Sequence, residues 1–89
     1  MIEHRIFKYE LLDRTNEVDM PAGAEVLTVQ IQHDKICLWA KVDPTARTEK
    51  RVFVVYGTGH PIEDDSNLSY IGTVQMAGGT LVWHVFEKK

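Results

Sequence analysis

The chain has 89 residues, with 10 Lys or Arg against 13 Asp or Glu, so its formal net charge is −3. This length favours one domain spanning residues 1–89, and the negative charge disfavours duplex nucleic acid as a partner. Hydrophobic residues make up 44% of the chain, enough for a core, but the apolar runs are too short to cross a membrane.

Apolar residues recur with a period of two or in short blocks, and many are β-branched or aromatic, which indicates β-strands. In chain order, the expected strands are 4–12, 15–20, 25–32, 36–42, 51–56, 69–76 and 80–87. Connections this short favour antiparallel pairs. The sequence therefore predicts an all-β fold: an antiparallel meander of about seven short strands that forms a small sandwich or half-barrel.

Turn-forming residues separate the expected strands: Pro21-Ala22-Gly23, His33-Asp34-Lys35, Asp43-Pro44 and Ala77-Gly78-Gly79. The second of these predicts a tight hairpin connection. The two longer connections, 43–50 and 61–68, are each expected to hold one helical turn. Asp43 or Thr45 would cap the first turn, and Pro61 would begin the second.

Two of the expected strands are apolar on both faces. In one of them, Leu81, Trp83 and Val85 alternate with Val82, His84 and Phe86. In the other, Val52, Val54 and Tyr56 alternate with Phe53 and Val55. A lone antiparallel sheet would keep one polar face. Either two layers close over these strands or one face is buried against another subunit. For so short a chain we expect a homo-oligomer, most simply a dimer.

The residue types give little support for catalysis or metal binding. Cys37 has no second cysteine to pair with and is expected to be a buried thiol. The four histidines form no HxH or HExxH pair, so no metal site and no cofactor is predicted. The GxSxG and phosphate-loop patterns are absent, so the protein is not expected to be an enzyme. Glu63, Asp64 and Asp65 match no EF-hand spacing and indicate a solvated acidic turn.

The strongest candidate for a binding site is the loop Gly57-Thr58-Gly59-His60-Pro61-Ile62, directly after the strand 51–56. Two glycines allow a tight bend that can turn backbone N–H groups toward an anion. Thr58 adds a hydroxyl group, and His60 adds an imidazole that can donate or accept a hydrogen bond. A loop in which the imidazole only caps its own turn would use the same residues, so both interpretations stay open.

Basic and aromatic residues could complete this site. The segment 41–51 carries four cations against Asp43 and Glu49. We expect the backbone of Thr58, Gly59 and His60 to meet a ligand phosphate together with Arg47 or Arg51. Tyr56 or Trp39 would stack on a base, although packing in the core is the more favoured role for Trp39. The predicted partner is thus a small anionic, nucleotide-like molecule.

Several segments carry a resemblance to a known family: Phe7-Lys8-Tyr9-Glu10-Leu11, Met20-Pro21-Ala22-Gly23-Ala24, Val29-Gln30-Ile31-Gln32, Cys37-Leu38-Trp39-Ala40-Lys41-Val42-Asp43, the loop 57–62, Tyr70-Ile71-Gly72-Thr73-Val74-Gln75 and Leu81-Val82-Trp83-His84-Val85-Phe86. On these segments, the chain resembles small uncharacterised proteins encoded mainly in bacteriophages and prophages. The loop 57–62 is the most specific part. By type, the chain is also similar to phage anti-defence proteins that act as sponges for nucleotide signals, such as cyclic ADP-ribose isomers or cyclic dinucleotides.

The resemblance implies a non-enzymatic protein of the host cytoplasm. Such a protein would bind and sequester a small, nucleotide-derived immune signal and so counter bacterial defence. Two alternatives remain open: a protein–protein interaction module that inhibits a host defence component, and a minor virion assembly protein. Neither a membrane nor duplex nucleic acid is an expected partner. The location expected without the resemblance is also cytosolic, because the single Cys37 allows no internal disulfide. The residues after Met1 form no apolar leader, so no signal peptide is expected.

Overall fold

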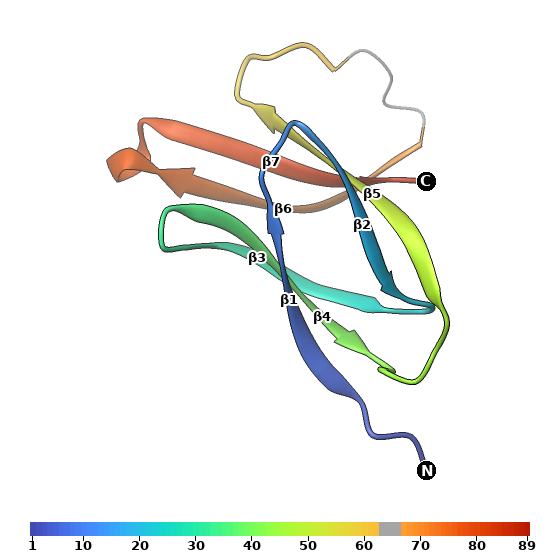
Figure 1. Cartoon of the computed structure of the whole chain (residues 1–89). Coiled ribbons are helices and arrows are strands. Elements are labelled where there is room, and N and C mark those ends of the chain that lie inside the picture. Colours follow the sequence, from blue (N-terminus) through green and yellow to red (C-terminus); the bar gives the residue numbers. More distant parts are fainter. Residues whose placement is uncertain (63–66) are drawn as a thin grey trace.

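The computed structural model describes residues 1–62 and 67–89 of the chain (Figure 1). The described strands are β1 (Arg5–Leu11), β2 (Thr15–Pro21), β3 (Glu25–Gln32), β4 (Lys35–Val42), β5 (Thr48–Gly57), β6 (Leu68–Met76) and β7 (Leu81–Lys88), with a short 3-10 turn, η1 (Ala77–Gly79), before the last. They form two antiparallel sheets, ordered β1-β4-β3 and β2-β5-β7-β6. The predicted all-β fold is confirmed.

The chain passes between the two sheets several times. Among the described strands, β3–β4 and β6–β7 are the consecutive pairs that form hairpins, whereas β1 to β2, β2 to β3 and β4 to β5 each change sheet. Strands β3 and β6 lie beside each other without forming a ladder, and β1 and β2 are the outer strands on the opposite side. The result is a two-layer sandwich that is not closed into a barrel, and its strand order is not sequential.

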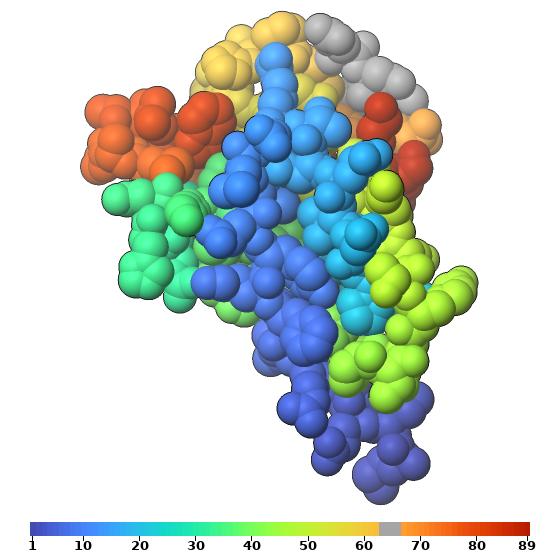
Figure 2. Space-filling model, in the orientation of Figure 1, coloured from blue at the N-terminus to red at the C-terminus, as the bar shows by residue number. Residues whose placement is uncertain are grey.

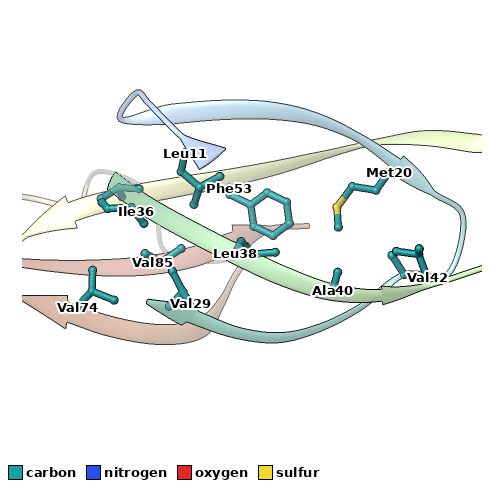
Figure 3. Packing of buried hydrophobic residues seen from close by; sticks show 12 residues of the cluster. Leu11, Met20, Val29, Ile36, Leu38, Ala40, Val42, Phe53, Val74 and Val85 are labelled. Carbon is teal, nitrogen blue, oxygen red and sulfur yellow. The ribbon is translucent and has the colours of Figure 1, made fainter. Parts of the chain in front are cut away.

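Apolar side chains from both sheets form the core between the layers (Figure 3). Phe53 on β5 and Met20 on β2 are fully buried against Leu38 and Val42 on β4 and Val85 on β7. One apolar face of β5 and one of β7 therefore lie in the core between the two sheets. This is the first of the two arrangements predicted above, in which a second layer covers these strands. Each such side chain contributes about 1.5–3 kcal/mol when it leaves water.

Most turns lie where the sequence predicts them. His33 and Asp34 have φ values of 52° and 61°, the left-handed conformation of a two-residue hairpin loop. Ala77 and Gly78 also have positive φ, 52° and 64°, in the connection between β6 and β7. Cys37 is buried, as expected.

The helical turn expected in 43–50 is wrong. Asp43 does organise the connection, because its Oδ1 accepts hydrogen bonds from the backbone N–H of Thr45 at 2.9 Å and from the Thr45 hydroxyl at 2.6 Å. The chain then extends, and Thr48 already pairs with Pro21 of β2. Pairing with β2 supplies backbone hydrogen bonds that a short, isolated helical turn would lack. The second helical turn was expected within 61–68, and residues 63–66 of that segment lie outside the described part of the chain. The expected acidic turn at Glu63, Asp64 and Asp65 lies outside it as well.

A buried amide holds the connection between β1 and β2. The side chain of Asn16 is 8% exposed. Its Nδ2 donates to the carbonyl oxygens of Asp13 at 2.7 Å and Phe53 at 3.3 Å, and its Oδ1 accepts the N–H of Asp13 at 2.9 Å. Asn16 therefore fixes the β1–β2 turn against β5, which carries the candidate loop at its end. In the described part of the chain, no helix is long and apolar enough to span a membrane.

Candidate ligand-binding site at the loop 57–62

The loop folds back onto the end of β5, and its histidine covers the first glycine. The N–H of Gly57 donates to Nδ1 of His60 at 3.3 Å, and the N–H of His60 donates to the carbonyl oxygen of Gly57 at 3.0 Å. A Cβ atom on Gly57 would lie 2.7 Å from Cε1 of His60. Gly59 has φ = 87°, a conformation that other residues rarely adopt. The two glycines thus serve different needs, close approach at Gly57 and backbone conformation at Gly59.

These hydrogen bonds also decide which groups of the loop remain for a ligand. The N–H of Thr58 donates to the carbonyl oxygen of Val82 at 3.2 Å, and the N–H of His60 is used within the loop. The expected set of three N–H groups facing a ligand is therefore wrong, because the Thr58 N–H is bonded to β7 and the His60 N–H closes the turn. Because Nδ1 of His60 accepts the Gly57 N–H, the ring nitrogen that remains to donate a hydrogen bond is Nε2. That N–H is the donor His60 can offer.

A cavity of about 700 Å³ opens at this end of the sandwich. Its apolar walls come from both sheets, from the β1–β2 connection and from the loop 57–62. The apolar lining residues are Leu11, Leu12, Ile36, Val55, Pro61 and Trp83. Its polar lining residues are Asp13, Arg14 and His60. Figures 1 and 2 show the loop, in yellow, at the same end of the molecule as the blue β1–β2 turn. Small-molecule sites have volumes of roughly 300–1,000 Å³, so this cavity has the size of a ligand site.

His60 and Trp83 line both this cavity and a smaller neighbouring one. Their ring centroids are 6.3 Å apart and their planes are inclined by 66°, an edge-to-face contact. Both residues also line a second cavity of about 140 Å³, together with Gly57, Thr58, Thr80, Leu81 and Val82. The imidazole therefore contacts an aromatic wall on the inner side of the sandwich, and this contact holds the ring at the cavity.

Thr58 faces another group of polar side chains. Its Oγ1 lies 2.7 Å from Nε2 of His84, and Nδ1 of His84 lies 3.0 Å from Oγ1 of Thr73. The Tyr70 hydroxyl lies 2.5 Å from the same Thr73 oxygen. Each hydroxyl can donate or accept, so the chain of contacts suits either tautomer of His84. Sequence analysis missed this network, because it depends on the register that sets Thr73 opposite His84.

Tyr56 lies on the outer face of the four-stranded sheet, away from the inner set of Phe53 and Val55. Its ring packs edge-on to Phe86 at a centroid distance of 6.1 Å, and Tyr70 contacts the same Phe86 at 5.5 Å. The guanidinium carbon of Arg14 lies 5.7 Å from the centre of the Tyr56 ring. Arg14 thus connects this aromatic group to the cavity, which it also lines.

The structure does not bring Arg51 to the loop. Arg51 donates from Nε and Nη2 to the two carboxylate oxygens of Glu87, at 2.6 and 2.8 Å, and from Nη1 to the carbonyl oxygen of Ala24. The Arg51 and Glu87 side chains are 18% and 14% exposed. The hydrogen bonds with Glu87 raise the pKa of Arg51, against the opposing effect of burial. Arg51 therefore joins β5 to β7 and to residue 24 and is already occupied.

Arg47 and Trp39 are also away from the loop. Arg47 is exposed and precedes β5, whose ten residues span about 30 Å in extended form. Trp39 lies on β4 in the other sheet, opposite Lys8 and Thr28. Thr58, Gly59 and His60 stay together with Tyr56 nearby, but Arg47, Arg51 and Trp39 do not join them. Arg14 and Trp83 are the residues that sequence analysis missed. No local motif marks either residue as part of a site.

Within residues 1–62 and 67–89, no three His, Cys, Asp or Glu side chains gather where they could hold a metal ion.

The fold and this site define a small antiparallel β-sandwich domain with a cavity at one end, between a glycine-containing loop and the connection from β1 to β2. The family described as "Domain of unknown function (DUF7352)" matches residues 2–89, and the chain belongs to this family. Comparison with curated proteins gave no match, and comparison with solved structures gave none.

Proposed function

We propose that this protein is a non-enzymatic binding protein that sequesters a small anionic ligand of the nucleotide class. The observation that carries the proposal is the cavity of about 700 Å³, with apolar walls and with Arg14 and His60 among its few polar lining residues. Apolar walls with a few polar groups that orient the ligand are typical of small-molecule sites.

The lining residues offer complementary contacts for such a ligand. Trp83, Ile36 and Val55 provide apolar surface for a flat ring. The guanidinium of Arg14 can donate two parallel hydrogen bonds to a phosphate group. The Nε2–H of His60 adds a further hydrogen-bond donor. Together these groups favour a ligand with a planar apolar part and an anionic part.

Sequestration sets a requirement on affinity. At micromolar protein concentration, depletion of a signal needs a nanomolar Kd, or about −12 kcal/mol. A few charge-assisted hydrogen bonds and one stacked ring reach this value only in a site that is ordered before binding. The contacts of His60 with Gly57 and Trp83 supply such order in the loop.

The resemblance to small phage proteins supports a biological setting for this chemistry. In that setting, the ligand is a nucleotide-derived immune signal of the bacterial host, and its removal in the host cytoplasm weakens the defence response.

Isothermal titration calorimetry against cyclic nucleotides and ADP-ribose derivatives tests the proposal. Arg14→Ala should weaken binding of the ligand at least roughly tenfold, the effect of losing a hydrogen bond to a charged group. His60→Ala should weaken binding while the protein stays folded. Arg47→Ala is the matched control, because Arg47 is an exposed arginine that does not line the cavity. No binding heat from any compound, or equal effects of Arg14→Ala and Arg47→Ala, would reject the proposal.

A second candidate is a protein–protein interaction module that inhibits a host defence component. It is favoured by the aromatic group Tyr56, Phe86 and Tyr70 on the outer sheet face, where Tyr70 is 60% exposed. A host protein recovered in equimolar amount with the wild type and lost with Tyr70→Ala would support this function over ligand binding. The third reading, a minor virion assembly protein, requires the chain to be present in purified particles.

A further inference from the structure

Strand β1 presents an unpaired edge with exposed apolar side chains. It is one of the two outer strands of its sheet, and β4 is its ladder partner in the described part of the chain. Ile6 is 62% exposed, Phe7 37% and the adjoining Leu12 72%. In Figure 2, the blue segment containing β1 runs along the face toward the viewer. An open edge of this kind is a template for another strand.

We propose that β1 binds β1 of a second copy of this chain in antiparallel register, with Tyr9 opposite the partner's Tyr9. Two identical antiparallel strands pair about a two-fold axis, so paired residues must point to the same side of the sheet. The residue numbers of each pair must therefore have an even sum. This condition leaves few registers within β1.

The register centred on Tyr9 joins complementary side chains. Lys8 lies opposite the partner's Glu10, and Glu10 lies opposite the partner's Lys8. On the inner side, Phe7 lies opposite the partner's Leu11. Continued past the end of β1, the same register sets Ile6 opposite the partner's Leu12, two of the most exposed apolar side chains. Opposite charges and apolar pairs across strands each stabilise a sheet.

The neighbouring registers are worse. Centring the pair on Lys8 places two ammonium groups opposite each other, and centring it on Phe7 places Ile6 opposite the partner's Lys8. Within one chain, Lys8 donates to Gln32 at 2.8 Å and Glu10 pairs with Lys35 at 3.3 Å, both on the exposed outer face. Exposed pairs of this kind contribute little, so they do not oppose a change of partner.

Among the described strands, the outer strand of the other sheet on the same side of the sandwich is less suited to pair with itself. Strand β2 is also an outer strand, but its outward charges are Glu17 and Asp19. When β2 pairs with itself about Val18, each of these carboxylates lies opposite a carboxylate of the partner. Like charges directly opposite each other are destabilising. Self-association is therefore assigned to β1.

The proposed dimer places a second subunit beside the candidate cavity. In the same register, Asp13, which lines the cavity, comes opposite the partner's Arg5 just past the end of β1. The interface does not depend on the proposed ligand, because its argument uses only the edge, the charges and the apolar side chains of β1.

Charge exchange at positions 8 and 10 tests the register. By sedimentation equilibrium, the wild type should show twice the chain mass of 10.2 kDa. Lys8→Glu and Glu10→Lys should each raise the dimer Kd roughly tenfold or more, because each symmetric dimer then has two like-charge pairs. Lys50→Glu is the matched control for Lys8→Glu, because it makes the same charge change on the other sheet. It should leave the dimer Kd unchanged.

Mixing the two single variants gives the sharper measurement. The Lys8→Glu chain presents two carboxylates and the Glu10→Lys chain two ammonium groups, so both pairs between positions 8 and 10 in a mixed dimer join opposite charges. The mixture should form dimers of both chains, and the double variant Lys8→Glu/Glu10→Lys should recover self-association. Circular dichroism spectra confirm that each variant is folded. A monomeric wild type, single variants that dimerise like the wild type, or a mixture that stays monomeric would overturn the proposal.

Discussion

The imidazole of His60 lies over the backbone of Gly57, and its Nδ1 accepts the Gly57 N–H at a distance of 3.3 Å. This contact explains why the loop has a glycine at the last position of β5 and a histidine three residues later. The sequence left open whether His60 stabilises its own turn or lines a binding site. The ring does the first through Nδ1, and it also lines the cavity. The hydrogen bond to Gly57 thus holds the His60 ring at the cavity.

Gly57→Ala should lower the free energy of unfolding by about 1–3 kcal/mol, the cost of forcing atoms into a filled space. The added methyl would lie 2.7 Å from Cε1 of His60 and must displace the ring. Urea denaturation measures the change. In the background His60→Ala, the same Gly57→Ala substitution should cost much less. An equal cost in both backgrounds would show that the ring is not the obstacle.

Arg51→Ala should lower the free energy of unfolding by about 2–3 kcal/mol. The substitution leaves the Glu87 carboxylate largely buried without its partner, and fully buried pairs cost 3–5 kcal/mol when broken. The partial exposure of both side chains lowers the expected value. Since the pKa of Arg51 is raised on folding, the guanidinium stays charged and its contribution is present throughout the neutral pH range.

Lys50→Ala is the control for Arg51. Lys50 is the preceding residue, and its pair with Glu17 is 3.8 Å long with side chains 57% and 64% exposed. Guanidinium chloride denaturation should show a change of less than about 0.5 kcal/mol for this variant. Similar losses for Lys50 and Arg51 would contradict the structural role assigned to Arg51.

Asn16→Ala should lower the free energy of unfolding by about 2–3 kcal/mol. It removes the amide that bonds to Asp13 and to the Phe53 carbonyl oxygen and leaves buried groups without partners. Thermal and urea denaturation measure the loss. Asn67→Ala, at an exposed asparagine, should change stability by at most about 0.5 kcal/mol. A small effect at Asn16 would mean that the β1–β2 turn is held by other contacts.

The contribution of the Asp43 carboxylate to the stability of the fold should decrease as the pH falls. Hydrogen bonds from the Thr45 hydroxyl and N–H lower the pKa of Asp43 below its usual 3.8. A carboxyl group whose pKa is lowered on folding stabilises the fold above its unfolded pKa and loses this effect as the pH falls through the folded value. The stability difference between the wild type and Asp43→Ala should therefore be constant near neutrality and shrink below pH 3.8. A difference that grows on acidification would contradict this assignment.

Sequence reasoning recovered the strands because burial on alternate faces leaves a period of two in the chain. Phe53 and Val55 show this pattern, and both lie in the core. It failed for the segment 43–50, where local capping residues indicated a helical turn. The pairing of β5 with β2 is a contact between distant segments, and no pattern within 43–50 reports it.

In the candidate site, too, the features that depend on neighbouring residues could be predicted, and those that depend on distant segments could not. Gly57, Gly59 and His60 were identified because their conformational and chemical properties are local, and the structure places His60 at a cavity. The contribution expected from Arg51 depended on where β5 carries it. An extended strand moves a side chain about 3.3 Å along its axis with each residue, so Arg51 lies far from Gly57 and binds Glu87 instead.

The sequence by itself determined the fold class, the turns at His33–Asp34 and Ala77–Gly79, and the loop 57–62, because each follows from properties of neighbouring residues. Only the tertiary structure decided which cation and which aromatic ring accompany His60. Arg14 and Trp83 come from distant parts of the chain, and the stacking of two sheets brings them to one cavity. Strand order sets such contacts, and strand order is a property of the whole chain.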